Sequence, residues 1–363
     1  MSDKNASVSA YRSPAPLLAR QLRGILREFI MSLSLIDFIA YSAVIFTAFV
    51  IIRYFIELLQ ISNLKRRAVF ITGCDTGFGH DLAIRCLQHG MPVFAGCLTV
   101  KGSENLEKVS KLLSGKLRVI IMDVTKKEDI LKARKILEDE CPQYGGLHGL
   151  VNNAGITSKE AYDDFLTLED YKKVADVNTW GVIQVTHELK HLVKKTKGRI
   201  VTVASICARV VLPSNGPYNV AKHAVAAYCD TIRQELRLFG VSVHILEPGF
   251  FKTPLIDFPK MRAEMSKGWT DAPKHVREEY GEEFYKKSEE LSLDFLQTVS
   301  SDRIDYVIDA YFHALTAVFP RPRYQVGWDS ILLFIPFSLI PTPIQDLVYK
   351  VAALRLPKPA ACR

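Results

Sequence analysis

The sequence predicts an α/β fold in which a doubly wound parallel sheet is covered by helices on both faces. Short apolar runs alternate with longer amphipathic stretches from residue 67 onward, and a glycine-rich turn follows the first run directly. This alternation is typical of parallel sheets, because a crossover helix must return the chain to the edge where each strand begins. No linker rich in Gly, Pro or Ser divides the region, so we expect one domain.

Six apolar runs are expected to be buried strands. They are AVFIT (68–72), MPVFAGCL (91–98), LRVIIMDV (117–124), LHGLVNNAG (147–155), RIVTVAS (199–205) and VSVHILEPG (241–249). Apolar residues recur at helical spacing in the stretches between them. The expected helices cover residues 79–89, 103–114, 126–140, 169–196 and 218–239.

Composition excludes several classes of protein. Of the 363 residues, 48% are hydrophobic and 24% are charged, which are ordinary globular values and not those of a disordered or collagen-like chain. The seven cysteines are scattered and form no C-x-x-C pair, so we expect buried thiols and no metal site. Of the net charge of +8, residues 1–67 carry +5, from nine Lys/Arg against four Asp/Glu. A basic flank beside an apolar segment favours lipid headgroups over nucleic acid.

An N-terminal segment is apolar enough to be a membrane anchor. Residues 38–52 carry no charge, and counting from Ile30 or Met31 reaches the roughly 20 residues that a spanning helix needs. Asp37 would then lie near the headgroups. An amphipathic or buried helix and a cleaved signal peptide fit the pattern less well. Basic residues nearly balance on the two sides, so the orientation stays open.

The expected domain organisation follows from these segments. A basic tail covers residues 1–30, the transmembrane anchor 31–60, the catalytic domain 65–320 and an apolar C-terminal extension 321–363. Within the extension, ILLFIPFSLI (331–340) is too short to span a bilayer. We expect it to be core, with a dimer contact or a second interfacial patch as the alternatives.

The turn after the first strand has the chemistry of a pyrophosphate site. It reads TGCDTGFG (72–79), with glycines at 73, 77 and 79. Such glycines turn the chain tightly and bring backbone N–H groups and a helix N-terminus to a pyrophosphate. A plain turn between a strand and a helix would need one glycine at most.

A tyrosine and a lysine later in the chain suit acid–base chemistry. Tyr218 and Lys222 are four residues apart, so they share one face of a helix. An ammonium group beside the phenol is expected to lower the phenol pKa, so that Tyr218 exchanges a proton with an alcohol or carbonyl oxygen while hydride moves. Ser205, at the end of the neighbouring strand, is placed to hydrogen-bond the same oxygen.

These motifs together resemble the short-chain dehydrogenase/reductase family, with its Rossmann-like fold. Five motifs stand in the family's order over about 250 residues: the glycine turn, NNAG (152–155), Asn178, Ser205 with YNVAK (218–222), and PG (248–249) followed by Thr253. The resemblance implies a catalytic set of Asn178, Ser205, Tyr218 and Lys222, in which Asn178 holds a water behind Lys222. It also implies a set of cofactor-binding residues, namely Gly73, Asp75, Thr76, Gly77, Phe78, Gly79, Asp123, Val124, Asn153, Ala154, Gly155, Tyr218, Lys222, Pro248, Gly249 and Thr253.

The choice of cofactor depends on charge near the adenosine ribose. The second strand ends GCLT (96–99), without the acid that hydrogen-bonds a ribose diol and without an Arg for a 2′-phosphate. Asp75 would repel a 2′-phosphate, and Lys101 is the only nearby cation. We therefore expect NAD, and leave NADP open.

Local phrases narrow the resemblance to a branch with lipophilic substrates. The glycine turn, CLT (97–99) and EPGFFKT (247–253) look like retinol and hydroxysteroid dehydrogenases, and residues 250–300 are expected to form a helical substrate lid. Other stretches look like D-3-hydroxybutyrate dehydrogenase, for which Arg209 is a candidate partner of the substrate carboxylate. NGP (215–217) and Phe250 favour the lipophilic alcohol.

The branch also implies partners and a location. We expect a membrane-anchored enzyme, in the endoplasmic reticulum rather than a mitochondrial membrane, and a homodimer formed through the helices that carry Asn178 and Tyr218. A non-catalytic scaffold that binds a dinucleotide is the alternative from another class, and the intact catalytic set disfavours it.

Overall fold

A computed structural model describes residues 21, 23, 24 and 34–363, in two units that cover Met1–Leu59 and Gln60–Arg363. The expected basic tail 1–30 and the first residues of the expected anchor lie almost wholly outside the described residues. In the first unit, α2 (Leu35–Glu57) begins at Ser34, which forms a reciprocal capping box with Asp37. Residues Asp37–Glu57 form one helix that is long and apolar enough to cross a membrane, by length and composition.

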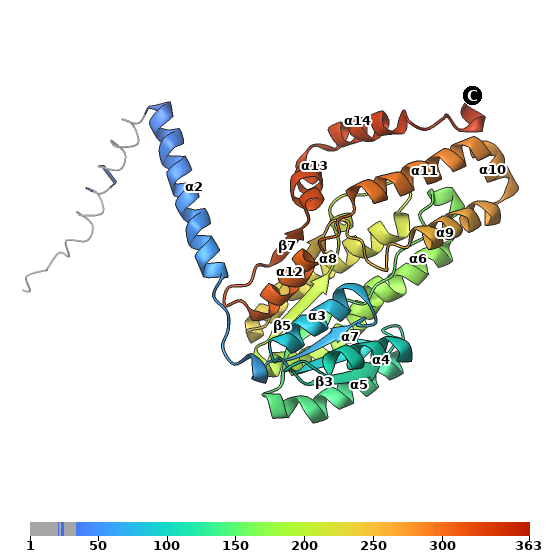
Figure 1. The fold of residues 1–363 in the computed structure, drawn as a ribbon. Coiled ribbons are helices and arrows are strands. Elements are labelled where there is room, and N and C mark those ends of the chain that lie inside the picture. The colour runs from blue at the N-terminus through green and yellow to red at the C-terminus, as the bar shows by residue number, and fades with distance from the viewer. Residues whose placement is uncertain (1–20, 22, 25–33) are drawn as a thin grey trace, which may run out of the picture. The chain divides into compact units, whose positions relative to one another are not determined.

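The second unit is built on a seven-stranded parallel sheet in the order β3-β2-β1-β4-β5-β6-β7 (Figure 1). All six pairs of neighbouring strands are parallel. The strands are β1 (Ala68–Thr72), β2 (Val93–Cys97), β3 (Leu117–Ile121), β4 (Leu147–Asn152), β5 (Arg199–Val203), β6 (Ser242–Pro248) and β7 (Arg323–Val326). The strand order reverses between β1 and β4, and ligands of such sheets bind at that switch point.

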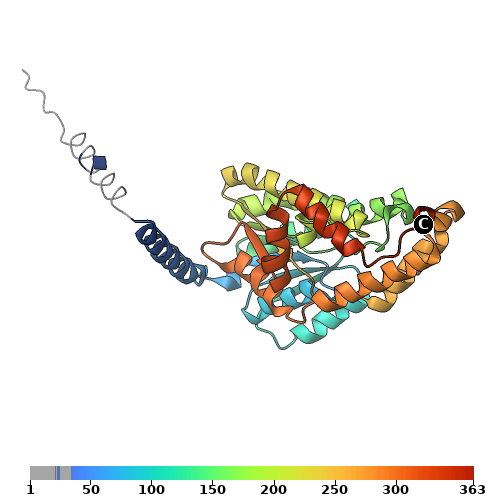
Figure 2. The same cartoon turned by 90° about the horizontal axis from the view of Figure 1, so that it is seen from above.

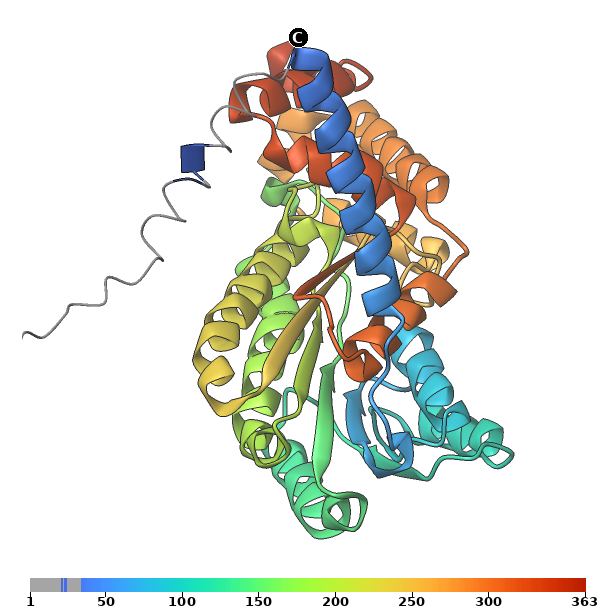
Figure 3. The same ribbon diagram turned by 90° about the vertical axis from the view of Figure 1, so that its left-hand side faces the viewer.

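Helices cover both faces of the sheet, which confirms the predicted fold class. One core cluster joins the sheet to α5 (Lys127–Glu140), α7 (Val182–Thr196) and α8 (Gly216–Leu236). The other joins it to α3 (Gly77–Gln88), α4 (Val100–Ser110) and α12 (Asp305–Thr316). Figure 3 shows α7 and α8 (green to yellow) and α3 and α4 (blue to cyan) on opposite sides of the strands.

The helix expected over residues 169–196 is divided in three. A capped helix α6 (Leu168–Ala175) leads into a π-helical turn, η4 (Asp176–Gly181), before α7. The turn passes the sheet closely, since a Cβ on Gly181 would lie 2.9 Å from a Val124 methyl. π-turns are often found at functional sites, and this one carries Asn178.

Two expectations for the C-terminal region are wrong. The catalytic domain does not end at 320, because β7 (Arg323–Val326) pairs with β6 as an edge strand of the same sheet. The segment 331–340 is not core: Leu332 is 73% exposed and Leu339 is 78% exposed, and Phe334 alone in the segment is buried. A π-turn, η7 (Ser330–Phe334), α13 (Ile335–Leu339) and α14 (Thr342–Ala353) carry this apolar stretch over the surface.

Most of the segment 250–300 is helical, as expected, beginning at Phe258. They form α9 (Phe258–Asp271), α10 (Lys274–Tyr280) and α11 (Glu282–Val299). The C-terminal end of the chain lies beside α10 and the start of α11 (Figure 2), where Arg363 forms a 2.6 Å ion pair with Glu283.

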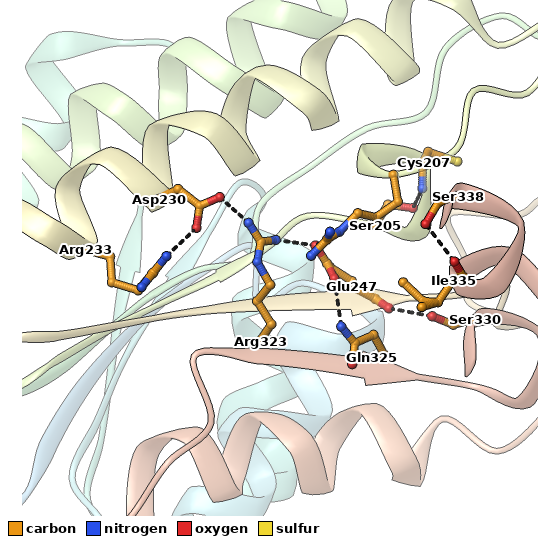
Figure 4. A network of polar contacts seen from close by, with 11 residues as sticks. Ser205, Cys207, Asp230, Arg233, Glu247, Arg323, Gln325, Ser330, Ile335 and Ser338 are labelled. Carbon is orange, nitrogen blue, oxygen red and sulfur yellow. Dashed lines mark hydrogen bonds and ion pairs between the residues drawn. The ribbon is translucent and has the colours of Figure 1, made fainter. Parts of the chain in front are cut away.

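A buried carboxylate joins β6, β7 and the loop after β5. Glu247 is fully buried, and its Oε1 accepts hydrogen bonds from Arg209 Nε at 2.9 Å and from Arg323. Arg323 also pairs with Asp230 of α8 (Figure 4). Ser330 donates to the Glu247 carbonyl at 3.2 Å. Since Arg209 follows Ser205 by four residues, the network fixes the strand ends that carry the catalytic candidates.

Removing this carboxylate is expected to destabilise the fold strongly. In Glu247→Gln, two partly buried arginines lose their common counter-ion, which typically costs about 3–5 kcal/mol. The loss is read from thermal or denaturant unfolding of the detergent-solubilised chain. Glu169→Gln is the matched control, because Glu169 is 77% exposed and pairs with Lys172 at the surface. Equal losses for the two variants would contradict the role given to Glu247.

Candidate active site

Two adjoining cavities open at the carboxyl ends of the strands. One is lined by the glycine loop and the ends of β2, β3 and β4, and the other by the ends of β5 and β6 and by α8. They share part of their lining, including Asn153, Gly155 and Thr253. An elongated ligand can therefore lie over the glycine loop and reach Tyr218 in the second cavity.

The glycine loop has the close packing that its sequence predicts. Gly73 has a φ of +71°, and a Cβ there would lie 2.8 Å from the Cα of Ala154. A Cβ on Gly79 would lie 2.3 Å from the Gly73 carbonyl oxygen. Gly73 therefore allows the turn, and Gly79 allows α3 to pack against the first strand.

Asp75 supplies an acidic group where the second strand lacks one. Its carboxylate accepts hydrogen bonds from the backbone N–H groups of Leu98 and Thr99 at 2.8 and 2.9 Å, and from the Thr99 hydroxyl at 2.7 Å. Gly102 makes room for it, because a Cβ there would lie 2.4 Å from Asp75. Lys101 is exposed and does not line the cavity. The negative charge thus stands at the end of β2, where a ribose diol is expected.

The structure gathers most of the expected cofactor residues around the two cavities. The first is lined by Gly73, Asp75, Thr76, Phe78, Asp123, Val124, Asn153, Ala154, Gly155 and Thr253. The second adds Tyr218, Lys222, Pro248 and Gly249. Gly77 and Gly79 line neither cavity. Gly77 allows the turn, with a φ of +64°, and Gly79 allows the close packing. A Cβ on Gly77 would meet the Thr253 side chain at 3.8 Å, which places Thr253 over the glycine loop.

Tyr218 and Lys222 meet on one face of α8, as their spacing predicts. The Lys222 Nζ lies 5.4 Å from the centroid of the Tyr218 ring. Lys222 is only 3% exposed, and its Nζ donates a 3.1 Å hydrogen bond to the Val203 carbonyl. Both side chains line the cavity that Ser205 also reaches.

Burial dominates the acid–base properties of this pair. The pKa of Tyr218 is raised well above its usual value because burial penalises the phenolate, although the Ser205 hydroxyl acts in the opposite direction. The expected lowering of the phenol pKa is therefore wrong for this structure. Burial also lowers the pKa of Lys222 to about 8, because the cation loses its hydration.

Asn178 holds the backbone between the two cavities. Its Oδ1 accepts from the N–H of Ile156 at 2.9 Å, and its Nδ2 donates to the Ile156 carbonyl at 2.8 Å. Asn178 is buried and lines neither cavity. Since Ile156 lines both cavities, Asn178 positions a part of their shared wall.

Two acidic residues at the site were not expected from the sequence. Asp329 is fully buried after β7 and accepts from the Phe250 N–H at 2.7 Å, beside Gly249. Glu160 lines the cavity that contains Tyr218. Asp329 stands between the edge strand β7 and the apolar run that begins at Ile331. An acidic residue at such a place is an exception to the apolar pattern, and it could have been noticed in the sequence. Glu160 stands in a polar loop, and no pattern distinguishes it from a solvated residue.

Comparison with known proteins identifies the family. The family model for short chain dehydrogenases matches residues 67–260. The chain belongs to the short-chain dehydrogenase family. The expected family resemblance is thereby confirmed, and the glycine loop, Tyr218 and Lys222 of this short-chain dehydrogenase lie within the matched residues.

Relatives of this short-chain dehydrogenase match over nearly their whole lengths. It is 40% identical over 320 residues to 17-beta-hydroxysteroid dehydrogenase type 6 of Bos taurus, covering 88% of this chain and 98% of the relative. It is 39% identical over 311 residues to retinol dehydrogenase 16 of Homo sapiens, covering 85% and 95%. The expected branch is confirmed by these relatives.

Solved structures agree with the fold. A short-chain dehydrogenase from Streptomyces avermitilis superposes with a TM-score of 0.60 at 20% identity, covering 79% of this chain and 96% of that one. A short-chain dehydrogenase/reductase from Burkholderia phymatum, in complex with NAD, gives 0.58 at 20% identity, with coverage of 80% and 95%.

The lowered pKa of Lys222 predicts the pH dependence of carbonyl reduction. The ammonium form is present below pH 8 and is lost above it, whereas the raised pKa of Tyr218 keeps the phenol protonated. We expect kcat/KM for reduction to be level at lower pH and to fall through about pH 8. In Lys222→Arg the falling limb should move to higher pH, because a guanidinium stays charged. A wild-type profile that is level from pH 6 to pH 10 would contradict this assignment.

Proposed function

We propose that this chain is an NAD-dependent dehydrogenase that transfers hydride between the nicotinamide and a lipophilic alcohol or ketone of the retinoid or hydroxysteroid type. The observation that carries the proposal is the cavity beside Tyr218 and Ser205, which is lined mainly by apolar side chains. They are Phe78, Ile156, Val203, Ala204, Pro248, Phe250, Phe251, Leu255, Ile256, Met261 and Leu296. The names of the relatives support the same class of substrate.

The catalytic roles follow from the positions of four side chains. Tyr218 exchanges the proton of the substrate hydroxyl, and Ser205 hydrogen-bonds the same oxygen. Lys222 stabilises the phenolate through its charge, and Asn178 positions the cavity wall. The dinucleotide supplies the hydride acceptor when bound, and the glycine loop and Thr253 fit its pyrophosphate and carboxamide.

NAD is favoured over NADP by the position of Asp75. Its carboxylate is held by two backbone N–H groups at the end of β2, so it is fixed where a 2′-phosphate would lie. The carboxylate of Asp75 and a neighbouring 2′-phosphate would repel each other, whereas a ribose diol can donate hydrogen bonds to the carboxylate.

A four-carbon hydroxy acid fits the cavity poorly. Its carboxylate needs a cationic partner, and Arg209 is already bound to Glu247. Lys222 is the single cation among the described residues that line the cavity, and it is assigned to Tyr218. Glu160 adds an acidic group that would repel the substrate. We therefore place D-3-hydroxybutyrate second.

Association with a membrane is the proposed setting, through α2 and a second surface. This second surface, the C-terminal apolar surface, comprises exposed side chains of η7, α13 and α14, namely Ile331, Leu332, Leu333, Leu339, Ile344, Leu347, Val348 and Val351. Residues 331–358 carry three basic side chains and a single acid, Asp346. Apolar side chains with basic neighbours suit an anionic lipid surface. Endoplasmic reticulum membrane is proposed by analogy with the branch.

A homodimer is proposed through the surfaces of η4 and α8. Trp180 and Val220 are more than half exposed there, next to Asn178 and Tyr218 in the chain. Exposed large apolar side chains of this kind often mark contacts between proteins. Light scattering of the detergent-solubilised chain measures the mass, and a monomeric mass would contradict the dimer.

The function is tested by NADH formation from a panel of alcohols. We expect turnover of retinol, estradiol or saturated steroid alcohols, with little turnover of D-3-hydroxybutyrate and a preference for NAD over NADP. Tyr218→Phe should lower kcat by at least about 100-fold, because proton transfer loses its group. The variant should still bind NADH, which is measured by quenching of protein fluorescence. Turnover of D-3-hydroxybutyrate alone would overturn the proposal in favour of the second candidate.

The anchor is tested by alkaline extraction of membranes. The full chain should stay in the pellet, and Val44→Arg combined with Phe49→Arg should release it. Each charge at the centre of a spanning helix costs about 2.5–3.5 kcal/mol on insertion scales. Leu332→Ser is the control on the C-terminal apolar surface and should stay in the pellet. Retention of the double arginine variant would contradict a spanning α2.

A further inference from the structure

Glu160 is an acidic side chain in the cavity beside Tyr218, and it has no polar partner within the described part of the chain. It lines the cavity that contains Tyr218, Ser205 and Lys222, and it also lines a smaller cavity next to it. Its carboxyl group makes no hydrogen bond or ion pair with any residue that the structure describes. Glu160 is only partly exposed. A carboxyl group that loses hydration without gaining a partner is costly, and it therefore points to a ligand that supplies one.

The backbone around Glu160 is fixed to the segment that precedes α8. The Ser158 hydroxyl donates to the Asn215 side chain at 2.7 Å, and the Ala161 N–H donates to the Ser214 carbonyl at 2.8 Å. Asn215 lines the same cavity and precedes Tyr218 by three residues. The position of Glu160 relative to the reacting phenol is therefore set from both sides.

Neighbouring polar groups are already engaged elsewhere. Lys159 pairs with Asp170 at 2.7 Å, and Lys222 donates to the Val203 carbonyl. Across the smaller cavity, the Tyr285 hydroxyl donates to Glu289 at 2.5 Å. The buried thiol of Cys207, whose pKa is raised, interacts electrostatically with Glu160, Tyr218 and Asp329. None of these groups neutralises Glu160.

Burial raises the pKa of Glu160 to about 7. The carboxyl group is thus close to half ionised at neutral pH and accepts a hydrogen bond in either state. An apolar cavity with one such acceptor suits a lipophilic molecule with one further donor.

We propose that Glu160 is a specificity-determining residue, whose carboxyl group binds a second hydroxyl group of the lipophilic substrate, away from the alcohol that reacts with Tyr218. The inference rests on the proposed function and names the substrate class more closely: rigid apolar diols rather than simple alcohols. A second hydroxyl is chosen over an amine because the apolar walls and the Lys222 cation disfavour a charged amine.

The experiment compares three saturated steroid alcohols that share the reacting hydroxyl. At the far end of the ring system they carry a hydroxyl, a ketone or hydrogen. In the wild type we expect the kcat/KM of the diol to be at least about tenfold above those of the ketone and of the compound with hydrogen. The reason is that a hydrogen bond to an ionised group is worth about that factor. The difference should lie mainly in KM. A contact that is equal in the ground state and the transition state changes KM and not kcat.

Two variants make the test specific. In Glu160→Leu the preference for the diol should disappear. In Glu160→Gln the ketone should improve relative to the diol, because an amide N–H donates to a ketone at any pH, whereas the Glu160 carboxyl group donates only in its protonated state. Glu104→Leu, at an exposed position of α4, is the control and should keep the wild-type ranking. Binding of NADH checks that each variant is folded.

Failure of the inference is distinguishable from failure of the proposed function. If the wild type oxidises neither retinol nor any of the three steroids, the proposed function fails. If it oxidises retinol but none of the three steroids, the proposed function stands and the role of Glu160 is overturned. If it oxidises them with the same ranking as Glu160→Leu, the proposed function stands and the role of Glu160 is overturned.

Discussion

The site depends on the burial of one cation. Lys222 is 3% exposed, lies over the Tyr218 ring and, among the described residues, makes a single hydrogen bond, with the Val203 carbonyl. An ammonium group in this position has lost most of its hydration. The free energy of the cation therefore depends on the charges of the other groups in the cavity. A phenolate at Tyr218 is such a charge. The phenolate form that the reaction needs therefore also stabilises the buried ammonium group of Lys222.

The surrounding structure keeps that cation in place without neutralising it. The ion pairs of the buried Glu247 with Arg209 and Arg323 hold β6, β7 and the loop after β5 together outside the cavity. Asn178 likewise uses both its amide atoms on the backbone of Ile156. Glu247 and Asn178, which fix the geometry, are therefore satisfied by the protein, while Glu160 faces the cavity without a polar partner among the described residues.

Sequence patterns predict the parts of the fold that obey a simple period or a local rule. Six strands, the glycine turn and the shared face of Tyr218 and Lys222 follow from spacing alone. The four-residue edge strand β7 is too short to give a period, and the π-turn at Asn178 leaves the helical pattern almost unchanged. Segment 331–340 shows the limit of hydropathy, since an apolar run is equally compatible with a core and with a surface that binds lipid. The pKa of Tyr218 depends on burial, which no pair of residues in the sequence reveals.

The C-terminal apolar surface connects the proposed membrane setting to the chemistry. Its buried residue Phe334 belongs to a cluster with Ile206 and Cys207, against which Tyr218 and Phe250 pack. The Tyr349 hydroxyl of α14 donates a 2.6 Å hydrogen bond to the carbonyl of Val211, which lies in the segment between Ser205 and Tyr218. The same stretch of chain therefore contacts the wall of the substrate cavity on one side and exposes leucines on the other. A lipophilic alcohol dissolved in a bilayer is concentrated at such a surface, so a cavity next to it needs little affinity of its own, and its few polar groups are left to decide which alcohol reacts.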